Sequence, residues 1–146
     1  MTPVAGRGPV RALGIDPGSK RIGIAVSDRS GTIASPLTVL QRSRSRQHDL
    51  QQIAALVRDE EAEVVVVGLP LNMDGSHGRA AQLAIDEARR LATVVGVPVE
   101  MHDERRTTVS ADRSMLEAGL DAPARRQRVD KVAAAIMLQS WLDGRR

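Results

Sequence analysis

The stretch LGIDPGSKRIGIAVSD, residues 13–28, carries the strongest fold signal in the chain. Two short runs rich in β-branched residues, 11–16 and 21–28, are joined through PGSKR, which is typical of a β-hairpin. The first run ends on Asp16. Because a buried carboxylate without a partner is costly or takes up a proton, the rest of the chain has to supply a partner for this acid.

The residues after the hairpin extend it into a larger sheet. GTIASPLTVL, residues 31–40, predicts a third strand in which Pro36 is tolerated at a sheet edge. EVVVVGLP, residues 63–70, predicts a fully buried strand, and VPVEMHDE, residues 97–104, predicts a fifth one. Hairpin connections come first and helical connections later, so the order predicts an α/β fold with a mixed sheet, antiparallel at the start and parallel at the end.

Four segments have helical patterns. The first spans residues 46–62 and the second spans residues 76–95. A third is expected from Thr107 to Ala118, where Gly119 stops it, and Pro123 opens the last one, which runs through Trp141. The residues expected to face the core are Leu50, Ile53, Leu56 and Val57 in the first helix, and Leu83, Ala84 or Ile85, Ala88 and Leu91 in the second.

Length and composition bound the protein class. With 146 residues the chain fits one domain, expected over residues 11–146 after a loose tail at 1–10. No apolar run is long enough for a membrane span or a secretion signal, so we expect a soluble, cytoplasmic protein with no membrane partner. The absence of cysteine excludes disulfides, thiolate metal sites and cysteine nucleophiles.

The charge balance points to local rather than global recognition of anions. The 21 basic residues exceed the 18 acidic ones by only three, so an anionic partner has to be met by clustered cations. With no Phe, no Tyr and only Trp141, an aromatic platform for base stacking is nearly excluded. Recognition of a nucleic acid by its backbone and shape stays open.

Three carboxylates are placed where they can meet. Asp16 ends the first strand and Glu104 follows the fifth, and ligands bind beyond the carboxyl ends of strands in open α/β sheets. Asp130 lies on the apolar face of the last helix, in phase with Met137 and Trp141. Carboxylates within ~4 Å of one another repel by about 4 kcal/mol per pair at a dielectric of ~20, so without help they would take up protons. A divalent cation bound between them removes this repulsion. Oxygen ligands alone favour Mg²⁺ or Mn²⁺, and a pair of such ions supports phosphodiester hydrolysis.

Each acid also has a simpler interpretation. Asp16 before Pro-Gly is a common turn sequence. Glu104 could pair with Arg105 or Arg106, and Asp130 could pair with Lys131 near a helix start. Taken singly, these interpretations are favoured, and only the convergence of all three acids favours a metal site.

The second informative segment is VVVVGLPLNMDGSHGRAA, residues 64–81. A helix beginning after small residues offers free N–H groups to an anion, which makes Asn72, Asp74 and Gly75 candidates for phosphate contact. As plain structure, Asp74-Gly75 is a turn and Ser76 an N-cap. Lys20, Arg21 and Arg105 are further candidate phosphate contacts, and Thr107 is either a helix cap or one more.

Four ordered motifs together resemble the YqgF/RuvX family, the pre-16S rRNA nucleases also called Holliday-junction resolvase-like proteins. The motifs are LGIDPGSKRIGIAVSD, VVVGLPLNMDGSHGRAA, DERRTT and VDKVAAAIMLQSWL, and the resemblance runs from about Leu13 to Leu142. It implies a ribonuclease H-like fold, with a five-stranded mixed sheet flanked by helices, and a metal-dependent nuclease that matures the 5′ end of 16S rRNA. It also implies that Asp16, Glu104 and Asp130 are the catalytic, metal-holding acids.

Other functions remain as alternatives. Branched DNA is the second choice of substrate, and a symmetric homodimer would suit its two paired cuts. The hairpin motif also resembles the phosphate-binding hairpin of actin-like and sugar-kinase-like ATPases, but those need two domains and the chain is too short for both. A nucleic-acid-binding regulator of transcription without catalysis is a third class.

Overall fold

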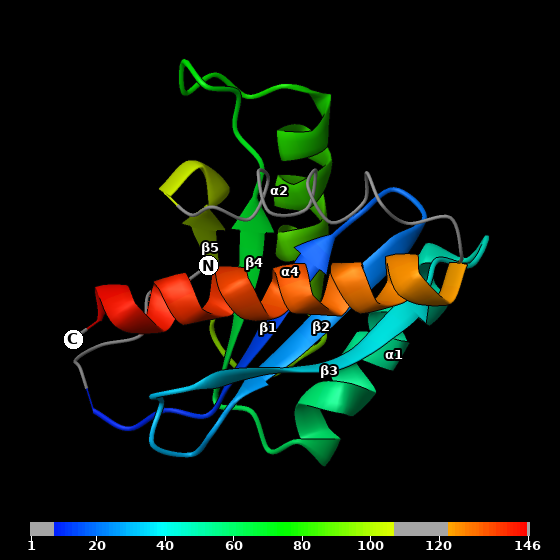
Figure 1. The fold of residues 1–146 in the computed structure, drawn as a ribbon. Helices are drawn as coiled ribbons and strands as arrows, with labels where there is room; N and C mark the ends of the chain where they lie inside the picture. Colours follow the sequence, from blue (N-terminus) through cyan, green and yellow to red (C-terminus); the bar gives the residue numbers. More distant parts are fainter. Residues whose placement is uncertain (1–7, 107–122, 146) are drawn as a thin grey trace.

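Five strands and three longer helices make up the part of the chain that the computed structural model describes, residues 8–106 and 123–145 (Figure 1). The helix predicted at 107–118, and Thr107 with it, lies outside the described residues. In chain order the elements are β1 (Ala12–Pro17), β2 (Arg21–Ser27), β3 (Ala34–Gln41), α1 (Arg46–Asp59), β4 (Val64–Leu69), α2 (Arg79–Ala92), β5 (Val99–Asp103), the 3₁₀ turn η1 (Glu104–Arg106) and α4 (Pro123–Gly144).

The strands form one sheet in the order β3-β2-β1-β4-β5. β1 pairs antiparallel with β2, and β2 pairs antiparallel with β3, whereas β1, β4 and β5 run parallel. The predicted mixed sheet is therefore confirmed. Pro36 lies in β3 at the edge of the sheet, where a residue without an N–H breaks no ladder on the outer side.

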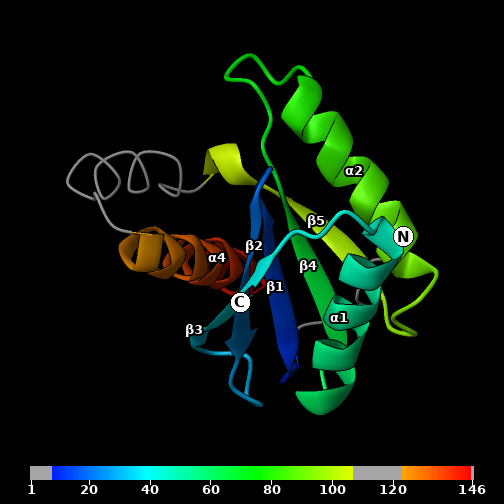
Figure 2. The same cartoon turned by 90° about the vertical axis from the view of Figure 1, so that its right-hand side faces the viewer.

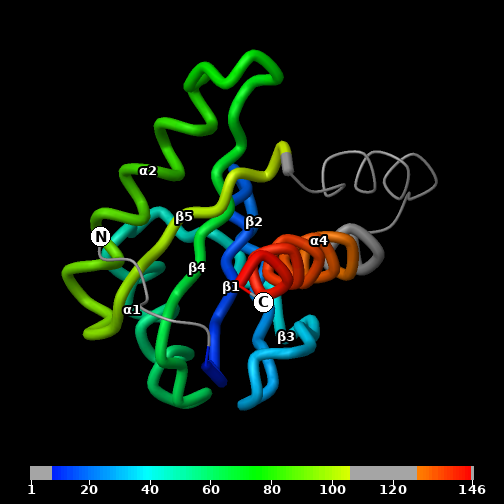
Figure 3. Tube along the Cα trace, turned by 90° about the vertical axis from the view of Figure 1, so that its left-hand side faces the viewer, coloured from blue at the N-terminus to red at the C-terminus, as the bar shows by residue number. Residues whose placement is uncertain are grey.

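Helices cover both faces of this sheet. Figure 2, which looks along the sheet, shows α4 on one side and α1 with α2 on the other, and Figure 3 shows the same layers from the opposite direction. Side chains alternate between the faces: Leu13 and Ile15 join the core under α1 and α2, while Ala12 joins the core under α4. Gly14 also faces α4, since a Cβ there would lie 2.9 Å from the Cβ of Leu138.

The second helix departs from its prediction in two ways. It begins at Arg79 rather than Ser76, and Leu83, predicted to face the core, is 52% exposed. The buried stripe runs through Ala81, Ala84, Ala88 and Leu91. Leu83 lies one residue, or about 100°, off this stripe, so it points to solvent. Among the described residues, no helix is both long and apolar enough for a membrane crossing.

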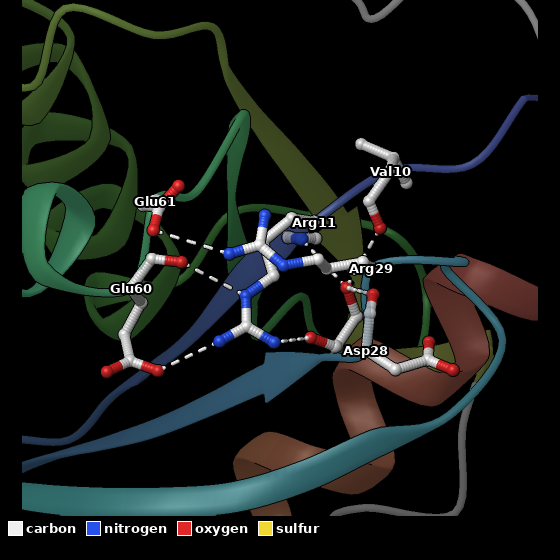
Figure 4. A network of polar contacts seen from close by, with 8 residues as sticks. Val10, Arg11, Asp28, Arg29, Glu60 and Glu61 are labelled. Carbon is white, nitrogen blue, oxygen red and sulfur yellow. Dashed lines mark hydrogen bonds and ion pairs between the residues drawn. The ribbon is translucent and has the colours of Figure 1, made fainter.

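A cluster of polar contacts around Arg11 and Arg29 lies at the amino-terminal end of β1 (Figure 4). The Arg11 guanidinium donates to the backbone carbonyls of Ser27 (2.5 Å) and Glu60 (3.0 Å) and forms an ion pair with the Glu60 carboxylate at 3.0 Å. The Arg11 N–H also donates to the Glu63 carboxylate. One side chain thus ties β1 to the end of β2 and to the end of α1.

Candidate active site

Asp16 sits near the carboxyl end of β1 and is only 3% exposed. By the alternation of the strand, its side chain lies on the face that α4 covers, two residues beyond Gly14. Its partner on β2 is Gly23. On the other side Ile15 pairs with Val67, so Gly68 of β4 comes next to Asp16. The acid therefore stands between two strand positions that carry no side chain.

Gly23 lets α4 approach the sheet. A Cβ at this position would overlap the backbone carbonyl of Asp130, so only glycine permits the observed packing. Asp130 is consequently held above β2, 9% exposed, and its carboxylate accepts a 2.5 Å hydrogen bond from Nε of Arg21. The side chain of Arg21 is about a quarter exposed, so this ion pair lies at the border of the solvent.

Gly68 makes room for the third acid in the same way. A Cβ there would lie 2.5 Å from Oε1 of Glu104 and 3.0 Å from its carboxyl carbon. Glu104 opens η1 directly after β5 and is 7% exposed. Burial, helped by the charge of the neighbouring Asp103, raises the pKa of Glu104 to about 7. This carboxyl therefore changes its charge near neutral pH.

The three predicted acids thus lie on the α4 face at the carboxyl-terminal edge of the sheet. In the residues that the structure covers, no group of three acidic or histidine side chains is gathered closely enough to hold a metal ion. The donor set fits a hard divalent cation, because it consists of carboxylates alone and one of them can release a proton. One of these carboxylates, that of Asp130, forms an ion pair with Arg21.

The other predicted contact residues have clear positions. Lys20 is exposed in the turn between β1 and β2. The loop around Asn72, Asp74 and Gly75 closes on itself: the Asn72 amide donates to the Ser76 hydroxyl at 2.9 Å, and the Asp74 carboxylate accepts from the Ser76 N–H and hydroxyl. These bonds lower the pKa of Asp74. Ser76 is not the N-cap of α2, which is Gly78.

Arg105 joins this loop to the end of β5. Its guanidinium contacts the Asp103 carboxylate at 2.8 Å and donates to the backbone carbonyl of Met73 at 3.3 Å. The hydrogen bonds to the Asp103 side chain, helped by its charge, raise the pKa of Arg105. The side chain therefore braces the loop beside the acidic edge.

Sequence reasoning missed the two glycines that shape the site. Gly23 and Gly68 each interrupt a β-branched strand, and a glycine inside a strand often marks a close approach of other groups. It also missed His102, whose Nε2 lies 3.0 Å from the Ser140 hydroxyl and so links β5 to α4. No spacing in the sequence points to that contact.

Comparison with known proteins agrees with this architecture. The model of the family RuvX, described as Holliday junction resolvase, matches residues 10–144. A relative from Anaeromyxobacter sp. is 50% identical over 93% of this chain and 98% of its own, and one from Myxococcus xanthus is 45% identical over 94% and 90%. Both are named "Putative pre-16S rRNA nuclease".

The fold is also found in a solved structure, "T. thermophilus RuvC in complex with Holliday junction substrate". It superimposes with a TM-score of 0.60 at 18% identity, over 92% of this chain and 96% of the other. At that identity the likeness concerns the fold, which is ribonuclease H-like as expected. The match over nearly the whole length and the identity near one half to the named relatives show that the chain belongs to the RuvX family.

Proposed function

We propose that this chain is a metal-dependent nuclease that hydrolyses phosphodiester bonds of precursor 16S rRNA, in the cytoplasm. The observation that carries the proposal is the burial of Asp16, Glu104 and Asp130 on one face, at the edge of the sheet where α/β proteins bind ligands. Family membership supports the reaction class, and the names of the relatives support the choice of RNA.

The three acids would hold one or two Mg²⁺ or Mn²⁺ ions. When bound, such ions supply the Lewis acid that activates water and stabilises the leaving oxygen. Glu104, whose pKa is raised to about 7, would act as a ligand in its deprotonated form. The Arg21 guanidinium, about a quarter exposed beside Asp130, would contact a phosphate of the strand.

The remaining contacts would be to the backbone of the nucleic acid. Lys20 and the loop of residues 72–78, braced by Arg105, lie at the same edge and would hold phosphates. Trp141 of α4 is buried in the core between this helix and the sheet, with the Arg145 guanidinium 4.8 Å from the centre of its ring, so it offers no platform for a base. Binding that rests on phosphates should weaken steeply with salt.

The test is cleavage of an RNA carrying the 5′ extension of 16S rRNA, with Mn²⁺ or Mg²⁺, by the wild type and by Asp16→Asn. We expect the variant to lose on the order of 10³-fold in rate. Asp59→Asn, which removes an exposed carboxylate at the end of α1, is the matched control and should keep full activity. Equal rates for Asp16→Asn and the wild type would defeat the assignment.

Branched DNA is the second candidate substrate, favoured by the family description and by the likeness to RuvC. A four-way junction needs two paired cuts, so this function calls for a homodimer. The mass of the protein in solution with each nucleic acid separates the two: a monomer on RNA supports RNA processing, and a symmetric dimer on a junction supports resolution. Binding without cleavage of either would support a regulatory role.

A further inference from the structure

A second feature of the molecule lies on the other face of the sheet. A cleft of about 290 Å³ opens between the β1–β2 turn, the start of α1 and one side of α2. Its walls include Pro17, Gly18, Arg42, Arg46, Leu83 and Arg90. Asp16 faces α4, whereas Pro17 points to the side of α1 and α2. The β1–β2 turn therefore separates the cleft from the acidic site.

One wall of the cleft is rigid. Arg42 forms two hydrogen bonds with the Glu87 carboxylate, at 2.7 and 3.0 Å, and its Nε donates to the carbonyl of Gly18 at 2.6 Å. Gly18 in turn donates its N–H to the carbonyl of Arg21. The charge of Arg42 is thus paired with that of Glu87, and the bond from Arg42 to Gly18 holds the β1–β2 turn against α2.

Two further arginines of the cleft are available to a ligand. Within the described residues, the guanidinium groups of Arg46 and Arg90 form no hydrogen bond or ion pair, and both residues are exposed. Arg46 is the first residue of α1, where the helix dipole disfavours a cation, so helix stability does not account for it. Among the described residues that line the cleft, the acids are Glu87 and Asp86; Glu87 is paired with Arg42, and the two arginines outweigh Asp86.

We propose that this cleft is a second phosphate-binding site, which takes a nucleotide of the substrate strand beyond those at the acidic edge. The inference rests on the proposed function. The exposed Lys20 lies in the turn between the two sites, so a strand in contact with Arg21 can cross the turn and reach Arg46 and Arg90. The exposed side chain of Leu83 offers an apolar wall to a sugar or base.

The size of the cleft selects the kind of strand. Its volume of about 290 Å³ lies just below the usual range of ligand pockets, about 300–1,000 Å³, so it admits a single nucleotide and not a duplex. Single-stranded RNA long enough to cross the turn should therefore bind more tightly than a short piece. The second site would position a flexible strand across the edge where the acids lie.

The experiment compares Arg46→Ala/Arg90→Ala with Arg58→Ala/Arg89→Ala, which removes two exposed arginines from the same helices but outside the cleft. Dissociation constants are measured for single-stranded RNA of about 4 and about 16 nucleotides. All titrations are done without divalent ions and at several salt concentrations. Circular dichroism melting curves establish that both variants are folded.

We expect the cleft variant to bind the long RNA about tenfold more weakly, to bind the short RNA as the wild type does, and to have a salt slope lower by about 1.4, since two phosphate contacts are lost. The control variant should show no such difference between its affinities for the long and the short RNA. Equal losses in both variants, or none in either, would overturn the second site.

A nucleoside monophosphate serves as a further probe. If it binds the wild type as tightly as the long RNA and loses this affinity in the cleft variant, the site serves free nucleotides and the strand proposal fails. Because binding is measured without cleavage, a length-dependent loss in a protein that cuts no RNA would uphold the second site while defeating the nuclease.

Discussion

The two ends of β1 use charge in opposite ways. At the amino-terminal end, the Arg11 guanidinium meets backbone carbonyls and the Glu60 carboxylate, so the cation and its acceptors are matched (Figure 4). At the carboxyl-terminal end, three buried acids share one face, and burial holds the pKa of Glu104 near 7. The first arrangement stabilises the fold, whereas the second gathers acids on one face, with Asp130 paired to Arg21 and the pKa of Glu104 raised, as is typical of functional sites.

The glycines sharpen this difference. Gly23 and Gly68 flank Asp16 and have no side chains, so they leave room for Asp130 and Glu104. The two glycines themselves contribute no side-chain packing. If stability alone decided these buried strand positions, β-branched residues would be favoured there. The space is therefore better explained by the site than by the core.

Arg11→Met should cause the largest loss of stability. It removes the hydrogen bonds to Ser27 and Glu60, one of them to a charged group, and we expect the free energy of unfolding to fall by about 3 kcal/mol. Urea unfolding measures it, with the exposed Arg58→Met as the control. Cleavage by the folded variant should persist, and a loss of cleavage at retained stability would contradict the division between the two ends.

Glu104→Gln should change how stability depends on pH. The pKa of Glu104 is raised from 4.5 to about 7 on folding, so the folded state binds more protons between these values and wild-type stability falls as pH rises through them. We expect the variant to lack about 2 kcal/mol of this fall between pH 5 and 8. Urea unfolding at both pH values tests it, and parallel curves for the two proteins would argue against the raised pKa.

Gly68→Ala should disturb the site more than the fold. The new methyl group would meet the end of the flexible Glu104 side chain, which can swing away at little cost. We expect cleavage to drop about tenfold, equivalent to about 1.4 kcal/mol, with the melting temperature nearly unchanged. Gly144→Ala, where an added Cβ would meet nothing within 4 Å, is the control.

Arg29→Ala should have the smallest effect. Its ion pair with Glu61 is 3.3 Å long, and both side chains are more than two thirds exposed. Such exposed pairs contribute at most about 1 kcal/mol. A thermal melt in low and high salt checks this, and a loss comparable to that of Arg11→Met would mean that the whole cluster in Figure 4 acts as one unit.

The sequence predicted most of the fold because its signals are local. Alternation and turn residues in 11–28 defined the hairpin, and the run of four valines at 64–67 defined β4. The second helix was harder, since its amphipathic stripe uses three alanines and Leu83 could be taken for a core residue. Small residues carry a weak periodic signal, so the phase of that helix is set by its packing on the sheet.

What the sequence determined by itself is the order of elements, the mixed sheet and the identity of three acids at the ends or faces of those elements. Only the tertiary structure decided how closely these elements approach one another. The backbone of α4 packs on Gly23, the Glu104 side chain packs on Gly68, and Arg21 forms an ion pair with Asp130. The reason is physical. Periodicity along a chain reports which side a residue faces, whereas distances between elements depend on how their side chains pack.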